Sequence, residues 1–330
     1  MIPNRPEGVL SFGHLECRQK NLYGNILLTF HTLPCKIERR LMGEIFIEYK
    51  KQRNAGNMEK KNYEIIVLDL DGTLTNRDKV ITPRTKTALM EAQKRGKKVV
   101  LASGRPTPGV LPLAEELCLK DYGGYILSFN GGMIMNCQTG EVVFSQMLPV
   151  EANKRIIELA EEHRVDFLTY ENDHLIVSNK ENEYAQKESW ITHMPMQEVE
   201  DTREYLNFPV PKFLMLDDGD YLALVEPRVK ASLGKNFSVY RSEPFFLEIL
   251  PKGIDKALSL ERLLEVIGMN REEMIACGDG YNDLSMIKFA GLGVAMENAV
   301  LPLRKIADYI TDSNNDDGVG KVVEKFMLFD

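Results

Sequence analysis

Two closely spaced carboxylates are the residues of this sequence best suited to chemistry. The segment Asp69–Thr73 reads Asp-Leu-Asp-Gly-Thr and follows the apolar run Ile65–Leu68, which predicts a buried parallel strand. Carboxylates at a buried strand end are costly unless a cation or hydrogen-bond donors meet them. Ligands also bind at this end of the strands in open α/β sheets. Asp69 and Asp71 therefore predict a site that holds a metal ion and performs phosphoryl chemistry. A strand followed by an ordinary Asx turn is the alternative interpretation.

Polar residues follow two other predicted strand ends. Ser103 comes directly after one strand and, with Gly104, offers a hydroxyl and backbone N–H groups suited to a phosphate oxygen. A simple turn before Arg105 is the alternative interpretation of Ser103. Asp279 and Asp283 follow another apolar run. Carboxylate oxygens with open water positions suit Mg²⁺, a hard octahedral ion that binds together with substrate phosphates.

Further polar groups lie near the same predicted strand ends. Lys252 and Lys256 stand at the start of a predicted helix, and either lysine could reach a phosphate. Asn282 lies between the two later carboxylates. Asn130 follows a fourth strand, where it either shapes the substrate entrance or forms a structural Asx turn.

Alternating strands and helices must position these residues. The first predicted helix has Thr82 as its N-cap and Pro83 at its first position, and it ends at Gly96. The other expected elements of this part are the strands Ile65–Leu68, Lys97–Ala102 and Tyr125–Phe129, and a helix near Val110–Leu119. Strands separated by helices of this length predict βαβ units and a mainly parallel sheet.

The middle of the chain has a different pattern. Its candidate strands are Phe167–Tyr170, His174–Val177, Phe213–Leu216, Tyr221–Val225, Ser238–Arg241 and Phe246–Ile249, with helices at about 151–163 and 181–193. Tyr170–His174 and Leu216–Asp220 have the composition of hairpin turns, so we expect an α+β insertion with an antiparallel sheet. Trp190 and the tyrosines of this region are expected in the core rather than as platforms for substrate.

The βα pattern resumes after the insertion. The expected elements are the helix Lys256–Ile267, ended by Gly268, the strand Met274–Cys277, a helix at about Asp283–Phe289, the strands Gly293–Met296 and Tyr309–Thr311, and a last helix with Asp316-Asp317-Gly318 at its N-cap. The chain is therefore predicted to be one α/β core interrupted by an insertion.

Together these motifs resemble those of the haloacid dehalogenase superfamily of phosphohydrolases. The large insertion between the second and third motifs is most similar to the Cof-type branch. Asp69–Thr73 resembles the first motif, Ser103 the second, Lys256 the third and Gly278–Asp283 the fourth. Four motifs in this order are far more specific than any one of them.

The resemblance implies a domain organisation. It covers roughly residues 60–330, with a Rossmann-like parallel-sheet core formed by residues 58–142 and 248–330. An α+β cap over residues 143–247 would determine substrate specificity. Residues 1–57 lie outside the resemblance, and our hypothesis is that Met58 is the natural start.

The resemblance also implies a role for each site residue. Asp69 is the expected nucleophile, and Asp71 the expected general acid and base. Mg²⁺ is expected to bind Asp69, the main-chain carbonyl of Asp71, and Asp279. The residues expected to bind the substrate phosphate are Leu70, Ser103, Gly104, Lys256 and Asn282. Lys256, also a catalytic residue in this interpretation, is preferred to Lys252 because the family places its lysine just inside the helix. Asp283 is expected to orient Lys256 or a metal-bound water.

Composition limits the class of protein. The chain has 330 residues, 44% hydrophobic and 27% charged, as is typical of a globular protein, and no run of about 18 apolar residues that would predict a membrane helix. Residues 1–60 carry a net charge of +4 and the remainder −12, which argues against nucleic acid as a partner. Scattered cysteines without a C-x-x-C pair are expected to be reduced thiols in a cytoplasmic protein: Cys17, Cys35, Cys118, Cys137 and Cys277.

The function expected from the resemblance is that of a Mg²⁺-dependent phosphatase. Its substrates would be small phosphorylated metabolites, with sugar phosphates favoured, because a large cap encloses small molecules and excludes polymers. A phosphomutase or phosphotransferase acting on sugar phosphates is one alternative. A catalytically silent protein that binds phosphorylated metabolites is another, although the groups needed for catalysis are present. We expect no membrane partner and a monomer or weak homo-oligomer.

Overall fold

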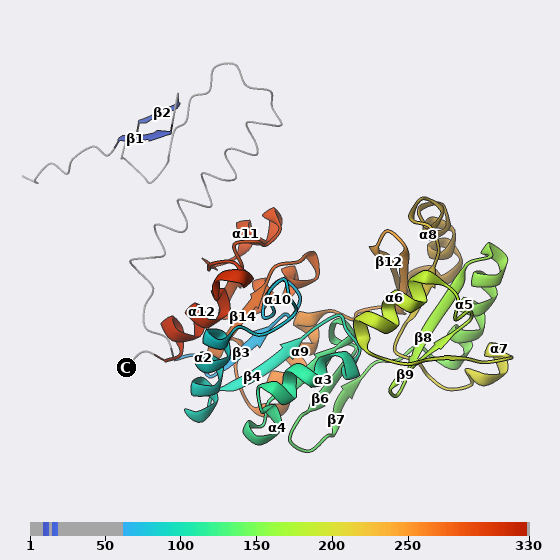
Figure 1. Cartoon of the computed structure of the whole chain (residues 1–330), viewed down its shortest axis with the longest axis horizontal. Coiled ribbons are helices and arrows are strands. Elements are labelled where there is room, and N and C mark those ends of the chain that lie inside the picture. Colours follow the sequence, from blue (N-terminus) through green and yellow to red (C-terminus); the bar gives the residue numbers. More distant parts are fainter. Residues whose placement is uncertain (1–8, 13–14, 19–61, 329–330) are drawn as a thin grey trace, which may run out of the picture. The chain divides into compact units, whose positions relative to one another are not determined.

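The computed structural model describes residues 9–12, 15–18 and 62–328. The chain divides into two compact units, Met1–Arg53 and Asn54–Asp330. In the first unit, the strands β1 (Val9–Phe12) and β2 (Leu15–Arg18) pair antiparallel (Figure 1). Most of the predicted extension, and the proposed start at Met58, lie outside the described residues, so that hypothesis stays a prediction.

An eight-stranded sheet forms the core of the second unit, in the order β16-β15-β14-β3-β4-β5-β6-β7. The first six of these strands run parallel, and β6 and β7 add an antiparallel edge. Their bounds are β3 (Ile65–Leu68), β4 (Lys98–Ala102), β5 (Tyr125–Ser128), β6 (Met133–Asn136), β7 (Val142–Ser145), β14 (Met274–Gly278), β15 (Leu292–Ala295) and β16 (Tyr309–Ile310). The predicted parallel-sheet core is confirmed.

Strand order explains where the site must lie. The chain proceeds from β3 outward through β4 and β5 on one side, and later from β14 outward through β15 and β16 on the other. The order therefore reverses between β3 and β14, and open α/β sheets bind ligands beyond the carboxyl ends of strands at such a point. All four residues of β3 are fully buried, as expected for a central strand covered on both faces.

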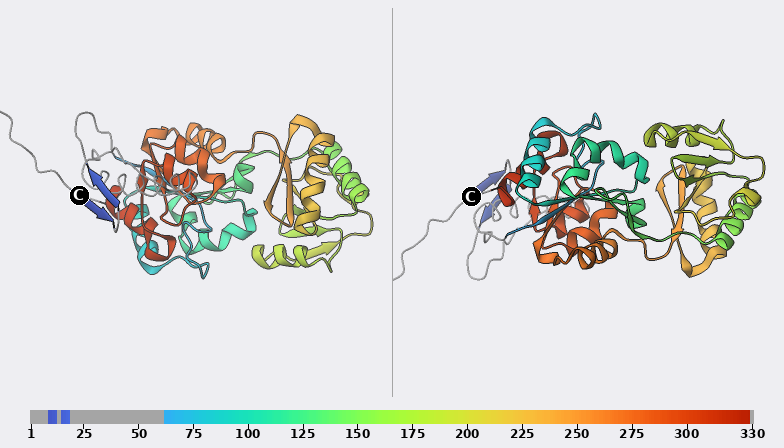
Figure 2. Two further views of the ribbon diagram at one scale, coloured as in Figure 1. Left: turned by 90° about the horizontal axis from the view of Figure 1, so that it is seen from above. Right: turned by 90° about the horizontal axis from the view of Figure 1, so that it is seen from below.

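Helices cover both faces of this sheet. Their bounds are α2 (Pro83–Lys94), α3 (Thr107–Glu116), α4 (Leu119–Tyr122), α9 (Lys256–Ile267), α10 (Leu284–Phe289), α11 (Leu301–Ile306) and α12 (Gly318–Phe326). In Figure 2, α9 and α10 lie on one face of the sheet and α3 on the other. Helix α9 has the predicted bounds. The Asp255 side chain caps it by accepting bonds from the backbone N–H groups of Ala257 and Leu258, and Gly268 ends it at φ +69°.

Local signals place two further helix starts. Pro83 begins α2, but the hydroxyl of its N-cap residue, Thr82, bonds the Asp317 carboxylate rather than the helix backbone. Asp317 is the N-cap residue of α12, as the sequence predicts, without a side-chain bond to that helix. These two starts are therefore tied to each other.

A six-stranded second sheet, in the order β10-β9-β8-β11-β13-β12, forms the cap. Its elements are β8 (Asp166–Glu171), β9 (His174–Val177), β10 (Met196–Glu198), β11 (Phe213–Leu216), β12 (Phe237–Glu243), β13 (Phe246–Pro251), α5 (Val150–His163), α6 (Glu183–Thr192), α7 (Thr202–Tyr205) and α8 (Gly219–Leu233). The other pairs of this sheet are antiparallel, as expected, but β9 and β10 run parallel, so the sheet is mixed. Figure 1 shows this sheet as a layer separate from the core sheet.

Side-chain alternation gives the cap sheet two different faces. Phe213 and Met215 of β11 pack with α5 and α8, whereas Leu214 and Leu216 pack on the other face with α6 and with Phe129 of the core. This alternation follows from the two-residue period of a strand. The face that carries Leu214 is therefore the one turned toward the core.

Two further expectations for the cap are wrong. Tyr221–Val225 lies inside helix α8, and the supposed turn before it contains the helix N-cap Asp218. Leu222, Val225 and Val229 are buried at helical spacing, a period that five residues are too few to reveal. Trp190 is not a core residue, because 76% of its surface is exposed.

The last strand of the core sheet before the cap and the last strand of the cap sheet indicate where the cap begins and ends. Strand β7 belongs to the core sheet through Ser145, and β13 belongs to the cap sheet through Pro251. The predicted cap range of 143–247 differs from these strand ends by a few residues, and that domain range remains a prediction.

Candidate active site

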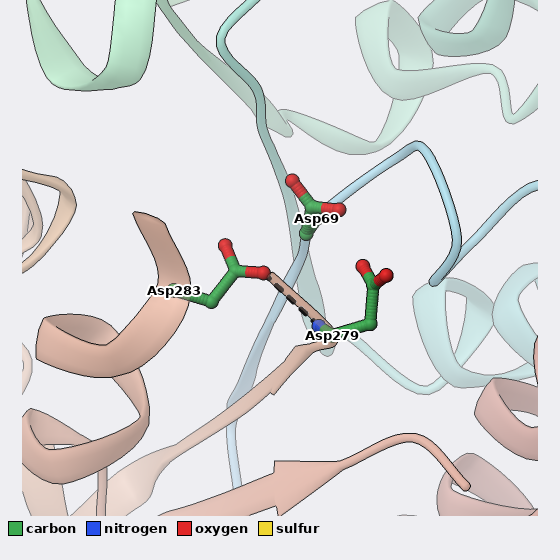
Figure 3. Close-up of side chains that lie close together, drawn as sticks. All are labelled: Asp69, Asp279 and Asp283. Atoms are coloured by element: carbon green, nitrogen blue, oxygen red, sulfur yellow. Dashed lines mark hydrogen bonds between the residues drawn. The ribbon is translucent and has the colours of Figure 1, made fainter. Parts of the chain in front are cut away.

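Two neighbouring strands bring the predicted carboxylates together. Strands β3 and β14 pair in register, and the backbone N–H of Asp69 donates to the carbonyl of Cys277 at 3.1 Å. One carboxylate oxygen from each of Asp69, Asp279 and Asp283 lies within 4.8 Å of the other two (Figure 3). The separated motifs thus meet at the strand ends, as the sequence pattern predicts.

Lys256 lies between two of these carboxylates. It is the first residue of α9, and its Nζ donates to Asp69 Oδ1 and to Asp283 Oδ1, each at 2.7 Å. The Lys256 side chain is fully buried. Burial alone would lower the pKa of Lys256, but the charges of Asp283 and Asp69 outweigh it and raise that pKa above its ordinary value. Lys252, the alternative lysine, is exposed and lies outside the cavity lining.

Asp283 is occupied by contacts within the protein. While Oδ1 accepts from Lys256, Oδ2 accepts from the backbone N–H groups of Asp279 at 3.0 Å and Gly280 at 2.9 Å. A Cβ atom at Gly278 would lie 2.6 Å from the Asp283 Cβ, so glycine is needed for this close packing. These contacts suit a residue that positions Lys256 and the segment of Asp279, rather than a ligand of an ion.

The negative charge around Asp69 and Asp279 exceeds the positive charge of the neighbouring protein groups. Burial first, and then the charge of Asp283, raise the pKa of Asp69 to about 8 despite the contact with Lys256. Burial and Asp283 likewise raise the pKa of Asp279 to about 6, against the Thr73 hydroxyl, which donates to its Oδ1 at 2.9 Å. Among the described residues of this cluster, three carboxylates face one ammonium group.

The donor set fits a divalent cation. Carboxylate oxygens are the ligands that hard ions such as Mg²⁺ prefer. Gly72 has φ +85°, and a Cβ atom there would lie 2.3 Å from Asp279 Oδ2, so glycine leaves space that this carboxylate needs. The crowded, undercompensated carboxylates of Asp69 and Asp279 are therefore suited to holding such an ion.

Asp71 has basic partners of its own. Its carboxylate forms a two-bond pair with Arg105, Nη2 to Oδ1 at 2.6 Å and Nε to Oδ2 at 2.8 Å, and Lys79 Nζ lies 2.6 Å from Oδ1. Burial acts to raise the pKa of Asp71, but Arg105 and Lys79 outweigh it and hold that pKa below its ordinary value. Arg105 also lines the cavity, and the sequence interpretation did not assign it a role. Its position two residues after Ser103 was the feature of the sequence that could have placed Arg105 in the site.

Ser103 and Gly104 lie at the end of β4, beside Asn130. Ser103 is buried, and its Oγ accepts the backbone N–H of Arg105 at 3.1 Å, so Ser103 forms a turn as well as lining the cavity. A Cβ atom at Gly104 would lie 3.2 Å from the Asn130 amide. Asn282 is exposed, and its Nδ2 donates to Asn130 Oδ1 at 3.3 Å. Both asparagines and Gly104 line the cavity.

Two residues of the site differ from simple expectation. Asn130 has φ +57°, between Phe129 at +53° and Gly131 at +102°, an uncommon backbone that is often found at functional sites. Leu70 is fully buried and outside the cavity lining, and its carbonyl accepts from the Thr75 backbone and hydroxyl. Asn130 therefore lines the cavity, whereas the Leu70 side chain does not reach it.

A cavity of about 710 Å³ connects these groups to the cap. From the core it is lined by Asp69, Asp71, Ser103, Gly104, Arg105, Asn130, Ile254, Asp255, Lys256, Asp279, Gly280, Tyr281 and Asn282. From the cap it is lined by Glu188, Ile191, Thr192, Lys212, Leu214, Tyr240, Arg241, Ser242, Glu243, Phe246 and Glu248. This volume can enclose a small molecule.

Comparison with known proteins identifies the family. The profile of the haloacid dehalogenase-like hydrolases matches residues 66–323. The chain belongs to the haloacid dehalogenase-like hydrolases. Its cap and motif order assign it to the Cof-type, subclass IIB, branch, so the predicted family and fold are confirmed.

Similar proteins agree with this assignment. A haloacid dehalogenase-like hydrolase from Bacteroides thetaiotaomicron is 48% identical, with a TM-score of 0.78 over 81% of this chain and 100% of that one. The subclass IIB sugar phosphatase BT4131 is 26% identical, with a TM-score of 0.67 over 81% of this chain and 100% of that one. The 5-amino-6-(5-phospho-D-ribitylamino)uracil phosphatase YcsE of Bacillus subtilis is 31% identical over 82% of this chain and 98% of its own length.

The predicted enzyme class is confirmed by this family membership. The chain is a haloacid dehalogenase-type phosphatase, a phosphoric monoester hydrolase that acts on small phosphorylated substrates. Within the described residues, every helix is too short or too polar to span a bilayer.

Proposed function

We propose that this phosphatase hydrolyses sugar and polyol phosphates through an aspartyl-phosphate formed on Asp69, with Mg²⁺ as its cofactor. The observation that carries the proposal is the buried contact of Lys256 with Asp69, beside Asp279, at the base of a cavity covered by the cap. Asp69 needs positioning more than activation, because a carboxylate next to a bound cation is ionised.

The chemistry has two steps. An oxygen of Asp69 attacks phosphorus, and the new O–P bond forms as the ester O–P bond breaks. The departing alkoxide takes a proton from Asp71. Water then attacks the phosphorus of the aspartyl-phosphate and returns a proton to Asp71, which releases inorganic phosphate and regenerates Asp69. Lys256 fixes Oδ1 of Asp69 during both steps, and its charge stabilises the phosphoryl oxygens.

Mg²⁺ would be held by Asp69, Asp279 and the main-chain carbonyl of Asp71. When bound, it neutralises the repulsion between the carboxylates and the phosphate and stabilises the charge on the transferring group. Ser103, Gly104 and Asn282 also line the cavity and would bind the remaining phosphate oxygens.

Asp71 must gain a proton for the first step. Its pairs with Arg105 and Lys79 oppose protonation. We therefore expect the substrate phosphate to compete with Asp71 for Arg105, because Arg binds phosphate and carboxylate with the same two-bond geometry. Loss of that pair would let the pKa of Asp71 rise as substrate binds.

The cavity and the relatives support the proposed substrate class. A covered cavity admits a small molecule and excludes a polymer. The relatives BT4131 and YcsE are a sugar phosphatase and a phosphatase of a phosphorylated ribityl compound, and both substrates carry phosphate on a hydroxylated carbon chain. These features support a hydroxylated phosphomonoester as the substrate.

Phosphate release from a panel of phosphorylated metabolites tests the proposal. Assays at neutral pH with Mg²⁺, repeated with EDTA, are compared with the Asp69→Asn variant as the blank. We expect release that requires the metal ion and is lost in Asp69→Asn. Absence of release from every panel compound, or equal release by Asp69→Asn, would contradict the proposal.

A further inference from the structure

The cap sheet carries charged side chains on the face turned toward the active site. Glu248 lies within β13, where its neighbours Leu247 and Ile249 point to the opposite, apolar face. Lys212 directly precedes β11, and Glu188 lies on α6. Glu248, Lys212 and Glu188 are 6%, 5% and 8% exposed, respectively, and all three line the cavity. With Tyr240, which also lines it, we call them the roof cluster.

Contacts within the roof cluster hold it in a defined arrangement. Lys212 Nζ lies 3.3 Å from Glu248 Oε2, and the Tyr240 hydroxyl donates to the same oxygen at 3.4 Å. The Tyr170 hydroxyl donates to Glu188 Oε1 at 2.7 Å. These contacts fix the positions of the charged groups but use only some of their hydrogen-bond donors and acceptors.

The remaining donors and acceptors of the roof cluster are available to a molecule in the cavity. Within the described part of the chain, the Lys212 ammonium has three donors but one carboxylate partner, Glu248 Oε2, and it lies 5.3 Å from the centre of the Tyr170 ring. Glu248 Oε1 and Glu188 Oε2 have no hydrogen-bond partner among these residues. Neither of these two oxygens is among the described polar atoms that lack both solvent contact and a partner, so both are accessible, and their residues line the cavity. Charged groups at such low exposure are costly to bury unless hydrogen bonds complete them.

We infer that the roof cluster binds the hydroxyl groups of the substrate's leaving group and selects uncharged, polyhydroxylated phosphomonoesters. The carboxylates of Glu188 and Glu248 accept from substrate hydroxyls, and Lys212 donates to a hydroxyl oxygen. A second phosphate at this position would face both carboxylates, so bisphosphates are disfavoured. An aryl group offers no hydroxyls and would leave the charges unpaired. This inference rests on the proposed phosphatase function and specifies how that same site selects its substrate.

Competing substrates with matched variants test the inference. The probes are ribitol 5-phosphate and glucose 6-phosphate, with glucose 1,6-bisphosphate and para-nitrophenyl phosphate for comparison, all with Mg²⁺. The variants are Lys212→Met and Glu248→Gln. Lys230→Met and Glu162→Gln are the matched controls, because Lys230 pairs with Glu226 and Glu162 pairs with Arg155 on the cap, and none of these four residues lines the cavity. The measured quantity is the ratio of kcat/KM for a hydroxylated monophosphate to that for para-nitrophenyl phosphate.

The inference predicts a change in this ratio, which misfolding would not produce. For the unmodified protein, kcat/KM should be highest for one of the two hydroxylated monophosphates. Lys212→Met and Glu248→Gln should each lower the ratio about tenfold or more, since a site left with unpaired polar groups loses discrimination on this scale. The two control variants should keep the ratio within about twofold.

Three results would count against it. Equal losses of kcat/KM on para-nitrophenyl phosphate and on the hydroxylated compounds would mean that the cluster has only a structural role, and unchanged kcat/KM values on all of these compounds would mean that it contacts no hydroxyl. Preference of the unmodified protein for the bisphosphate or the aryl phosphate would overturn the inference but leave the proposed function intact. Absence of metal-dependent phosphate release from all four probes would refute the proposed function itself.

Discussion

Replacement of Lys256 by methionine is the sharpest perturbation of the site. Lys256 Nζ is 2.7 Å from Asp69 and 2.7 Å from Asp283, and its side chain is fully buried. Methionine is close to lysine in length and flexible enough to fill the same space, so the main effect of Lys256→Met is the loss of a positive charge. It leaves two buried carboxylates without their shared cation.

The magnitude follows from the buried pair. Removing one partner of a buried ion pair costs about 3–5 kcal/mol. Protonation of Asp69, whose pKa is already about 8, relieves part of that cost. We therefore expect the folded state to be destabilised by about 3 kcal/mol, which lowers the Tm by about 4–6 °C for a chain of this length. Because the group that positions Asp69 and stabilises the charge on the phosphoryl oxygens is lost, kcat should fall by about 10²–10³-fold.

The matched control is Lys252→Met, which removes the exposed alternative lysine from the same segment. Its effect on the free energy of unfolding should be within about 0.5 kcal/mol, and its activity should be close to that of the unmodified protein. Thermal unfolding and phosphate release are measured for both variants side by side. A folded Lys256→Met protein with activity within tenfold of the original would refute the reasoning, as would an equal loss in Lys252→Met.

Other consequences of the same geometry can be measured separately. Mg²⁺ at about 100 times its Kd should stabilise the protein by about 2.7 kcal/mol, and Asp279→Asn should remove most of that increase in calorimetry. Arg105→Met should raise the pKa of Asp71 in an NMR titration. The variant should also be less stable than the unmodified protein at neutral pH, by about 1 kcal/mol or less for this partly exposed pair. Since the folded-state pKa of Asp71 lies below the unfolded value, this difference should disappear as the pH falls through the folded-state pKa. Gly72→Ala places a Cβ atom 2.3 Å from Asp279 Oδ2 and should weaken Mg²⁺ binding, whereas Gly140→Ala, with a similar φ of +74° and open space around it, should cost only about 1–2 kcal/mol of backbone strain. Equal Mg²⁺ affinity in the two glycine variants would contradict the crowding argument.

The core of the site could be predicted because its residues lie at strand ends. An apolar run followed by carboxylates identifies Asp69 and Asp279 from the chain alone, and the parallel pairing of β3 with β14 then brings them together. The start of α9 could be predicted for a similar reason, since Asp255 and Gly268 mark its ends locally. Local signals of this kind need no knowledge of distant contacts.

Features that depend on contacts between distant segments could not be predicted. The pairing of Asp71 with Arg105 joins two different loops. It lowers the pKa of Asp71, whereas a general acid needs a raised pKa. Tyr221–Val225 looks like a strand because its helical period extends beyond five residues, and the side chains that bury it come from the rest of the cap. Glu248 was visible as a charge inside an apolar run, but the sequence did not reveal that it faces the cavity.

The most direct test of the central claim is to trap the covalent intermediate. The enzyme is mixed with a substrate identified in the metabolite panel, quenched during turnover and treated with borohydride, which reduces an aspartyl-phosphate to homoserine. Peptide mass spectrometry should find homoserine at Asp69 only when both substrate and Mg²⁺ were present. Rapid phosphate release with Asp69 unmodified, or with the modification at another carboxylate, would contradict the assignment of Asp69 as the nucleophile.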